Sequence, residues 1–229
     1  MWYDCAMVDA RNIPLPEGLE LVRDERGLSL VRGDMALRGD FSQMLPRLRQ
    51  DRLAHELLVR AARVRGVENP VAVDATAGLG EDSLLLAAAG FSVTLFERDP
   101  VIAALLADAL ERAANDPQLE GIVARMCLVP GDAVEGLAQL DARPSVIFLD
   151  PMFPAKRKDA ATKKKLQLFQ MLESPCADEE ELLAAALAAR PRKVVVKRPL
   201  KGPNLAGAKP SSSISGKVVR YDVYVPAHE

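Results

Sequence analysis

The stretch VAVDATAGLGE, residues 71–81, decides the fold that we predict for this chain. It reads as a short buried strand over residues 71–75, a glycine-interrupted turn, and a helix over residues 81–89. Gly78 and Gly80 have no Cβ, so a ligand can lie against bare backbone, and the helix points its unpaired N–H groups at the same place. This layout is typical of a nucleotide-type site at the carboxyl edge of a parallel sheet.

The residues that follow the turn indicate which ligand such a site would take. Ser83 stands where a dinucleotide fingerprint has its third glycine. Glu81 and Asp82 occupy the first helical turn, where they suit the helix dipole but would repel a pyrophosphate. A cationic ligand without phosphates fits better, and S-adenosylmethionine is such a ligand. Taken alone, the stretch also fits an ordinary strand–turn–helix that binds nothing.

Strands and helices alternate from residue 71 to residue 225, which predicts an α/β fold with a doubly wound, mainly parallel sheet. Further strands are expected at residues 91–97, 124–129, 145–149 and 193–197, and residues 217–225 read as one arm of a terminal antiparallel pair. Helices are expected from Asp99, as N-cap before Pro100, and over residues 133–140, 163–172 and 178–190. Residues 202–216, rich in Gly, Pro, Ser and Asn, are expected to be a mobile loop.

The chain before this sheet divides into two further parts. Residues 1–42 form a small β-rich region, with a hairpin of residues 19–23 and 28–31 and a third strand at residues 35–37. Residues 43–66 read as a connecting basic helix, and residues 67–229 as the main domain. The helix carries six arginines that either track a phosphate backbone or form a solvated face: Arg47, Arg49, Arg52, Arg60, Arg63 and Arg65.

Acidic residues follow three successive strands of the predicted sheet. Asp74, Glu97 and Asp132 each stand at a strand's carboxyl end. Glu97 comes about twenty residues after the glycines, where an acidic side chain can accept hydrogen bonds from ribose hydroxyls. Because these ends meet at one edge of the sheet, we expect an acid-lined cleft.

The fourth strand runs into Asp150-Pro151-Met152-Phe153-Pro154, a stretch that suits methylation of an exocyclic base amine. The lone pair of such an amine is delocalised into the ring. The Asp150 carboxylate and the Pro151 carbonyl can accept its N–H hydrogens and so direct the lone pair. Phe153 can stack on the base, and the basic residues downstream can hold phosphates. The alternative interpretation is a common turn, a core phenylalanine and solvated lysines.

Composition excludes several classes of protein. The formal net charge of −2 gives no global basic field for nucleic acid, so only local patches can bind it. Three scattered cysteines and two histidines suggest neither a metal site nor a disulfide framework. No run of 18 apolar residues occurs. We therefore expect a reducing, cytoplasmic protein without membrane or metal partners, and the sequence does not indicate an oligomeric state.

Four motifs together resemble the bacterial ribosomal RNA small subunit methyltransferase J family: DATAGLG, LFERDPVIAALL, FLDPMFP before a basic segment, and VVVKRP. The likeness covers roughly residues 71–225, and the first forty residues show no convincing match. The resemblance implies the seven-stranded, Rossmann-like fold of class I SAM-dependent methyltransferases. It also implies methyl transfer from S-adenosylmethionine to the N2 amine of a guanine in 16S rRNA, with 16S rRNA or the small ribosomal subunit as partner.

Two alternatives remain open from the residues alone. Similar loops serve methyltransferases that act on adenine N6 in RNA or DNA, or on a protein amide. An NAD-dependent oxidoreductase on a related sheet is the alternative from a different class, and the missing third glycine argues against it.

The candidate site residues follow from the motifs and from the resemblance. The candidate catalytic residues are Asp150, Pro151 and Phe153. The candidate cofactor-binding residues are Asp74, Thr76, Gly78, Gly80, Glu81, Asp82, Glu97, Arg98, Asp132, Ala133 and Asp150. The candidate RNA-binding residues are Lys156, Arg157, Lys158, Lys163, Lys164, Lys197 and Arg198.

Overall fold

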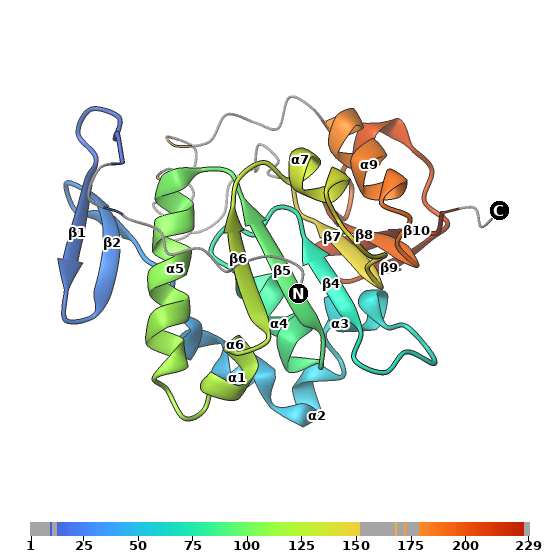
Figure 1. The fold of residues 1–229 in the computed structure, drawn as a ribbon, viewed down its shortest axis with the longest axis horizontal. Helices are drawn as coiled ribbons and strands as arrows, with labels where there is room; N and C mark the ends of the chain where they lie inside the picture. Colours follow the sequence, from blue (N-terminus) through green and yellow to red (C-terminus); the bar gives the residue numbers. More distant parts are fainter. Residues whose placement is uncertain (1–9, 11–12, 152–167, 169–171, 173–178, 227–229) are drawn as a thin grey trace.

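The computed structural model describes Ala10, residues 13–151, Leu168, Leu172 and residues 179–226, whose strands form two sheets (Figure 1). The larger sheet has the order β6-β5-β4-β7-β8-β10-β9. Its strands are β4 (Val71–Asp74), β5 (Ser92–Glu97), β6 (Met126–Pro130), β7 (Val146–Leu149), β8 (Lys193–Pro199), β9 (Ser212–Ser215) and β10 (Val219–Tyr224). The strands from β4 to β8 are parallel, and β10 is antiparallel to both neighbours. The predicted doubly wound, seven-stranded sheet is confirmed.

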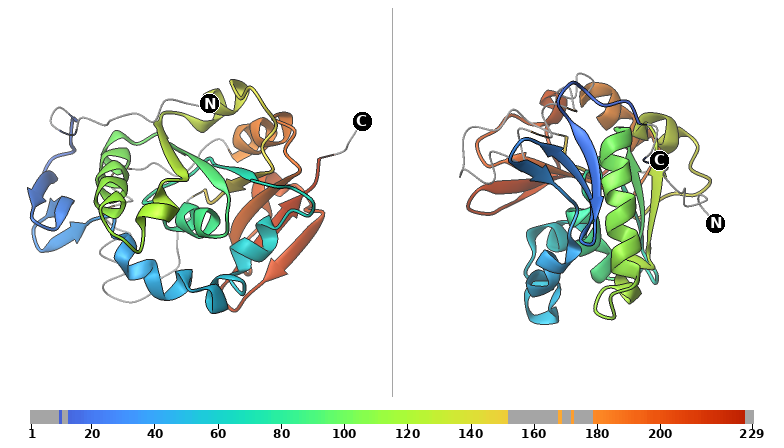
Figure 2. Two further views of the ribbon diagram at one scale, coloured as in Figure 1. Left: turned by 60° about the horizontal axis from the view of Figure 1, so that its bottom comes forward. Right: turned by 90° about the vertical axis from the view of Figure 1, so that its left-hand side faces the viewer.

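Helices cover both faces of this sheet (Figures 1 and 2). They are α3 (Leu57–Ala62), α4 (Glu81–Ala88), α5 (Pro100–Ala114), α6 (Glu120–Val123), α7 (Ala133–Ala138) and α9 (Glu179–Ala188). Successive strand residues alternate between the faces: Ala72 and Phe148 pack with α3 and α4, whereas Val73 and Ile147 pack with α7 and α9. All four are fully buried. This double burial explains why the central strands read as uninterrupted apolar runs.

Helix α5 is set by signals that the sequence shows directly. The Asp99 carboxylate accepts hydrogen bonds from the backbone N–H groups of Val101 (2.8 Å) and Ile102 (2.9 Å), and Pro100 opens the first turn. A side-chain cap of this kind contributes about 1 kcal/mol. Asn115 follows as the C-cap. The predicted N-cap and first helical residue are confirmed.

The N-terminal sheet lies against the outer side of α5 (Figure 1). It consists of β1 (Glu20–Asp24), β2 (Gly27–Arg32) and β3 (Met35–Leu37), as the hairpin pattern predicts. The buried Asp108 of α5 joins the two parts, because its carboxylate accepts hydrogen bonds from the Leu28 N–H (3.0 Å), Arg23 (2.6 Å) and Arg112 (2.8 Å). The sheet is thus tied to the main fold. The expected division of the chain at residues 42 and 66 stays a prediction.

Residues 45–65 do not form the single basic helix that their periodicity predicts. They form α1 (Leu45–Leu48), α2 (Gln50–Leu53) and α3, after a 3-10 turn η2 (Phe41–Met44). Arg49 and Glu56 have extended ψ angles of 136° and 129° and break the helix twice. Arg47 folds back onto Glu56 with two hydrogen bonds of 2.8 Å. The arginines therefore do not share one helical face, because the chain turns to bring each apolar segment into the core.

Two further expectations are corrected. Residues 202–216 are not one irregular loop, since they contain the 3-10 turn η3 (Leu205–Gly207) and the edge strand β9. Runs of serine lack the apolar alternation that marks a strand. Cys127 of β6 is disulfide-bonded, although the cysteine spacing suggested no disulfide framework. The expected helix at residues 163–172 lies mostly outside the described residues.

The two glycines of the turn between β4 and α4 have different surroundings. Gly80 has a φ of +77°, and a Cβ there would lie 2.7 Å from a methyl carbon of Leu106 and 3.2 Å from the Phe41 ring. Gly78 has a φ of +55°, and a Cβ there would meet nothing within 4 Å. The lack of a side chain at Gly80 therefore allows close packing against α5 and η2. At Gly78 the space beside the backbone is open.

This difference predicts unequal losses of stability. Gly80→Ala is expected to lower the free energy of unfolding by about 2–4 kcal/mol, because it adds overpacking to left-handed backbone strain. Gly78→Ala, the matched control, carries the strain alone and should lose about 1 kcal/mol. Urea denaturation of the two variants measures the difference. Equal losses would show that Gly80 is not packed as described.

Candidate functional site

A cavity of about 530 Å³ opens at the carboxyl ends of β4 to β8. It lies where the strand order reverses between β4 and β7, the position at which open α/β sheets bind ligands. The predicted site residues among its lining are Asp74, Thr76, Gly78, Glu81, Asp82, Glu97, Arg98, Asp132, Ala133, Asp150, Pro151 and Lys197. Gly80 is not among them, which agrees with its contacts in the core.

Glu97 connects the end of β5 to the glycine turn. Its Oε2 accepts a hydrogen bond from the Gly78 N–H (2.8 Å), and its Oε1 accepts one from the Asp99 N–H (2.9 Å). The residue is only 5% exposed, so its position is well fixed. A carboxylate oxygen can accept more than one hydrogen bond. Glu97 can thus hold the turn and face a ligand's hydroxyls together.

Asp132 and Asp74 complete the acid-lined cleft that the strand ends predict. Asp132 caps α7 through a 2.7 Å hydrogen bond from the Val134 N–H and is exposed. Asp74 is fully buried and accepts hydrogen bonds from the Ser83 hydroxyl (2.5 Å) and the Thr76 N–H (3.1 Å). Both line the same cavity as Glu97. Their contact with a ligand stays a prediction.

Burial raises the pKa of the Asp74 carboxyl to about 7, although the hydrogen bonds from Ser83 and Thr76 oppose the rise. The unfolded chain releases this proton near pH 4, whereas the folded protein keeps it until about pH 7. The contribution of Asp74 to the free energy of unfolding should therefore decrease as the pH rises from 4 to 7 and stay constant above pH 7.

Asp74→Asn provides the test of this titration, because asparagine keeps the shape and does not ionise. Between pH 5 and pH 7 the wild type should lose on the order of 2 kcal/mol of stability relative to the variant. Urea denaturation at several pH values measures it. A difference that is constant over this range would contradict a raised pKa for Asp74.

Asp150 stands at the mouth of the cavity, directly after β7. Its backbone N–H donates a 2.6 Å hydrogen bond to the Thr76 hydroxyl, which joins the residue to the glycine turn. Its Oδ2 lies 2.8 Å from the Nζ of Lys197, and the same Nζ lies 2.6 Å from Asp82 Oδ2. The Asp150 side chain is 34% exposed, so its carboxylate can be approached from the cavity.

Lys197 and Arg198, two of the predicted RNA contacts, point to opposite faces of β8. The Lys197 side chain is 26% exposed and lies in the cavity wall between two carboxylates. Arg198 points to the other face of β8, is 1% exposed, and binds Glu179 (3.2 Å) and the Pro203 carbonyl (2.9 Å). Both side chains are thus paired with carboxylates, and a contact of either with RNA stays a prediction. The valines that precede them mark a strand buried on both faces.

The other predicted residues fall outside the described part of the chain. They are Phe153, Lys156, Arg157, Lys158, Lys163 and Lys164. Within the described residues, no group of three or more His, Cys, Asp or Glu side chains is placed to hold a metal ion. Nor does any described helix have the length and apolarity that crossing a membrane requires.

The residues of the cavity fit S-adenosylmethionine. The backbone at Gly78 has open space where a Cβ would be, Glu97 can accept from ribose hydroxyls, and the acidic lining suits a cation. Glu81 and Asp82 in the first turn of α4 disfavour a phosphate. Bound there, this cofactor supplies an electrophilic methyl group.

Comparisons with known proteins give the same assignment. Residues 15–226 match the family model described as "Putative SAM-dependent methyltransferase", so the match extends through the N-terminal sheet. "Ribosomal RNA small subunit methyltransferase J" of Thioalkalivibrio sulfidiphilus is 48% identical over 215 residues, 90% of this chain and 84% of that protein. Its namesake from Aeromonas salmonicida is 49% identical over 171 residues, 74% of this chain and 69% of that protein.

A solved structure agrees with these relatives. The crystal structure of a SAM-dependent methyltransferase from Neisseria gonorrhoeae is 34% identical to this chain, with a TM-score of 0.75 over 94% of this chain and 86% of that one. The expected fold, cofactor and enzyme class are thereby confirmed. The chain is a SAM-dependent methyltransferase and belongs to the ribosomal RNA small subunit methyltransferase J family.

Proposed function

We propose that this enzyme transfers a methyl group to the exocyclic N2 amine of a guanine in 16S rRNA of the small ribosomal subunit. The observation that carries the proposal is the position of Asp150 at the edge of the cofactor cavity: its backbone N–H is bound by Thr76, and its half-buried carboxylate is paired with Lys197. The names of the relatives, which specify small-subunit ribosomal RNA, support the choice of substrate.

Asp150 and Pro151 would act by orienting the amine. The N2 lone pair of guanine is conjugated with the ring and is a weak nucleophile. Hydrogen bonds from the two N–H groups to the Asp150 carboxylate and the Pro151 carbonyl would hold the nitrogen so that its lone pair faces the electrophilic carbon. The carboxylate also stabilises the positive charge that develops on the nitrogen during transfer.

The cofactor would be held by groups from three strand ends. Glu97 would accept from the ribose hydroxyls, and the open backbone at Gly78 would allow close approach. Asp132 and Ala133 line the same cavity after β6 and would flank the adenine. The proposal leaves out Gly80, which packs inside the core.

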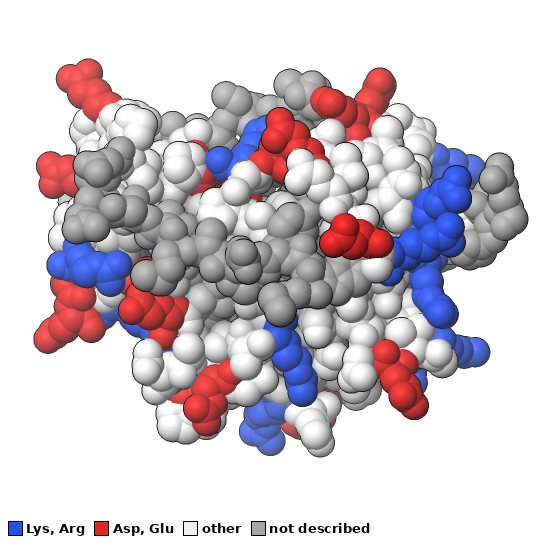
Figure 3. All heavy atoms as spheres, in the orientation of Figure 1, with Lys and Arg blue, Asp and Glu red and all other residues white. Residues whose placement is uncertain are grey.

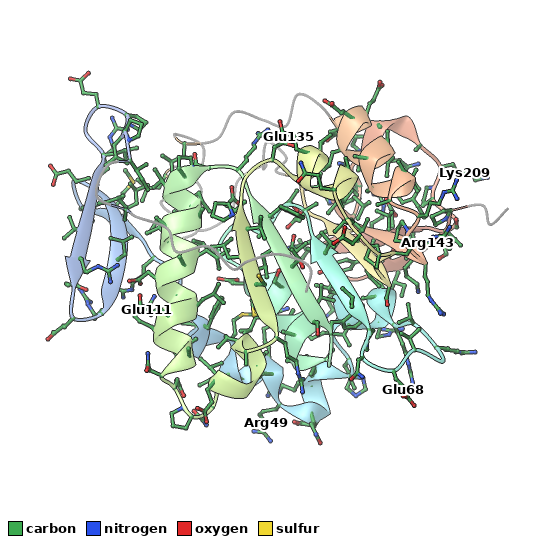
Figure 4. All side chains as sticks on the ribbon, viewed as in Figure 1. Arg49, Glu68, Glu111, Glu135, Arg143 and Lys209 are labelled. Carbon is green, nitrogen blue, oxygen red and sulfur yellow. The ribbon has the colours of Figure 1, made fainter. Side chains whose placement is uncertain are left out.

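For RNA we propose contacts from the basic residues after Asp150 and from a basic edge of the molecule. The predicted contacts outside the described residues are Lys156, Arg157, Lys158, Lys163 and Lys164. Figure 3 shows further Lys and Arg side chains gathered at the right-hand edge, where Figure 4 labels Arg143 and Lys209. Both of these residues are exposed. A local basic edge can bind phosphates although the whole chain is slightly acidic.

A methylation assay tests the proposal. Purified enzyme with labelled S-adenosylmethionine is incubated with 30S particles, and separately with protein-free 16S rRNA, from cells that lack the modification. Digestion and mass spectrometry of the nucleosides should reveal N2-methylguanosine in one of the two substrates. Label in N6-methyladenosine, or in a ribosomal protein, would replace the proposed acceptor, and no label in either substrate would contradict the proposal.

A further inference from the structure

Lys197 lies in the cavity wall between the carboxylates of Asp82 and Asp150. Its Nζ lies 2.6 Å from Oδ2 of Asp82, in the first turn of α4, and 2.8 Å from Oδ2 of Asp150, after β7. Three elements far apart in the sequence thus meet at one ammonium group.

The charges around this group explain why a cation is needed there. Two carboxylates that both lie within 3 Å of one atom repel each other strongly in a half-buried site, and one would take up a proton if no cation lay between them. Desolvation lowers the pKa of the Lys197 ammonium, but the charges of Asp82 and Asp150 outweigh it, so its pKa is raised. Lys197 therefore remains charged.

We propose that Lys197 is a positioning residue for methyl transfer: its ammonium holds Asp150 in place and ionised, and it does not contact RNA phosphates. The inference rests on the proposed function, in which Asp150 accepts hydrogen bonds from the amine. An ionised carboxylate only accepts hydrogen bonds, whereas a protonated carboxyl also donates one and would oppose an amine N–H. Lys197 would thus decide the pH range in which the enzyme works.

Asp150 is surrounded by groups that make this support necessary. Burial raises the pKa of the Asp150 carboxyl, Lys197 lowers it, and Asp82 raises it again. Asp74 of β4 faces Asp150, and Arg198 of β8 adds a weaker positive charge. Tyr221 of β10 pairs with Lys197 in the strand register, and Arg47 of α1 faces both Asp82 and Tyr221.

Tyr221 cannot replace the lysine as a charge partner. The ring is 5% exposed and lies against Phe148, with centroids 6.4 Å apart. Burial and the nearby Asp82 raise the pKa of its hydroxyl, so the side chain is neutral at the pH of any assay. Arg47 is engaged by Glu56 through two hydrogen bonds. Of the described cations, Lys197 alone forms an ion pair with Asp150.

The experiment compares Lys197→Met, which removes the charge, with Lys197→Arg, which keeps it. Lys193→Met is the matched control, since Lys193 lies on the same strand and binds the carbonyls of Ala61 (3.2 Å) and Arg63 (2.9 Å), away from the cavity. At pH 7, Lys197→Met should lower kcat on the order of 10- to 100-fold, with KM for the RNA substrate changed less than about threefold. Lys197→Arg should recover most of the rate, and Lys193→Met should retain it.

The pH dependence separates positioning from general damage. In the wild type, kcat should rise with pH as Asp150 ionises. In Lys197→Met this acid limb should move to higher pH by about one to three units, because an opposite charge within contact distance shifts a carboxyl pKa by that much. Adding Asp82→Asn to Lys197→Met should move the limb part of the way back, since it removes the second negative charge.

Unfolding gives a readout that needs neither cofactor nor RNA. The folded-state pKa of Asp150 is already raised by burial, and it should rise further when the charge of Lys197 is removed. Stability from this carboxyl is present at low pH and is lost as the pH rises through its folded pKa. The Tm difference between wild type and Lys197→Met should therefore be larger at pH 8 than at pH 5, and Lys193→Met should show no such trend.

Two results would overturn the inference. One is an unchanged acid limb and a pH-independent Tm difference in Lys197→Met. The other is a raised KM for RNA with unchanged kcat and a shallower salt dependence of RNA binding, which identifies a phosphate contact. Failure of the proposed function would look different, since wild-type enzyme would then not methylate guanine while the pH-dependent unfolding of Lys197→Met would persist.

Discussion

Asp150→Ala is expected to lower kcat by about 100- to 1,000-fold, while the Kd for S-adenosylhomocysteine changes less than about threefold. In the proposed mechanism the side chain accepts a hydrogen bond from the amine, so its loss removes an interaction that strengthens as positive charge develops in transfer. The backbone at residue 150 should stay in place, because the N–H bond to the Thr76 hydroxyl does not involve the side chain and survives the substitution.

Single-turnover methylation and calorimetry on the same preparation measure the two quantities. Asp150→Asn is the control: it keeps one acceptor oxygen without the charge, so its rate should lie between those of the wild type and the alanine variant. If turnover and cofactor affinity fell by the same factor in Asp150→Ala, Asp150 would be a cofactor ligand only, and its role at the amine would be wrong.

Glu97→Ala is expected to weaken S-adenosylhomocysteine binding by about 100-fold, or about 3 kcal/mol, because charge-assisted hydrogen bonds to the ribose are lost. The loss also leaves the N–H groups of Gly78 and Asp99 without their acceptor, so the turn beside the cofactor loosens. The two effects act in the same direction on affinity.

Glu135→Ala is the matched control for this variant. Glu135 lines the same cavity from α7 and is less buried than Glu97, so the substitution removes the same charge without touching the turn (Figure 4). Its Kd should change less than about threefold, since solvent-accessible charges interact weakly. Calorimetry at fixed salt compares the two. Similar losses of affinity in both variants would mean that the overall negative charge of the cavity, and not a fixed hydrogen-bond acceptor, determines cofactor binding.

The parts of the fold that were predictable from sequence depend on local signals. Short runs of adjacent residues predict the β4 strand, the glycine turn and the caps of α5. The register of a parallel sheet then brings the carboxyl ends of the strands together. For that reason the order of the residues alone is enough to assign Asp74, Glu97 and Asp132 to one cavity.

The features that the sequence did not predict have a common physical origin. They depend on tertiary contacts between residues that are far apart in the chain. The periodicity of residues 45–65 does not reveal the breaks at Arg49 and Glu56. Nor does the sequence reveal that Lys197 pairs with carboxylates from α4 and from the end of β7. Gly80 looks like a ligand-binding glycine, and only the packing of Leu106 against it shows its other purpose.

A crystal structure of the enzyme with S-adenosylhomocysteine shows directly whether the cavity is the cofactor site. We expect the adenosine in the cavity beside Glu97 and Asp132, with the ribose hydroxyls on the Glu97 carboxylate and the sulfur facing Asp150 and Pro151. Crystals grown with saturating S-adenosylhomocysteine in which the cavity holds no adenosine, or in which the sulfur faces away from Asp150, would contradict it.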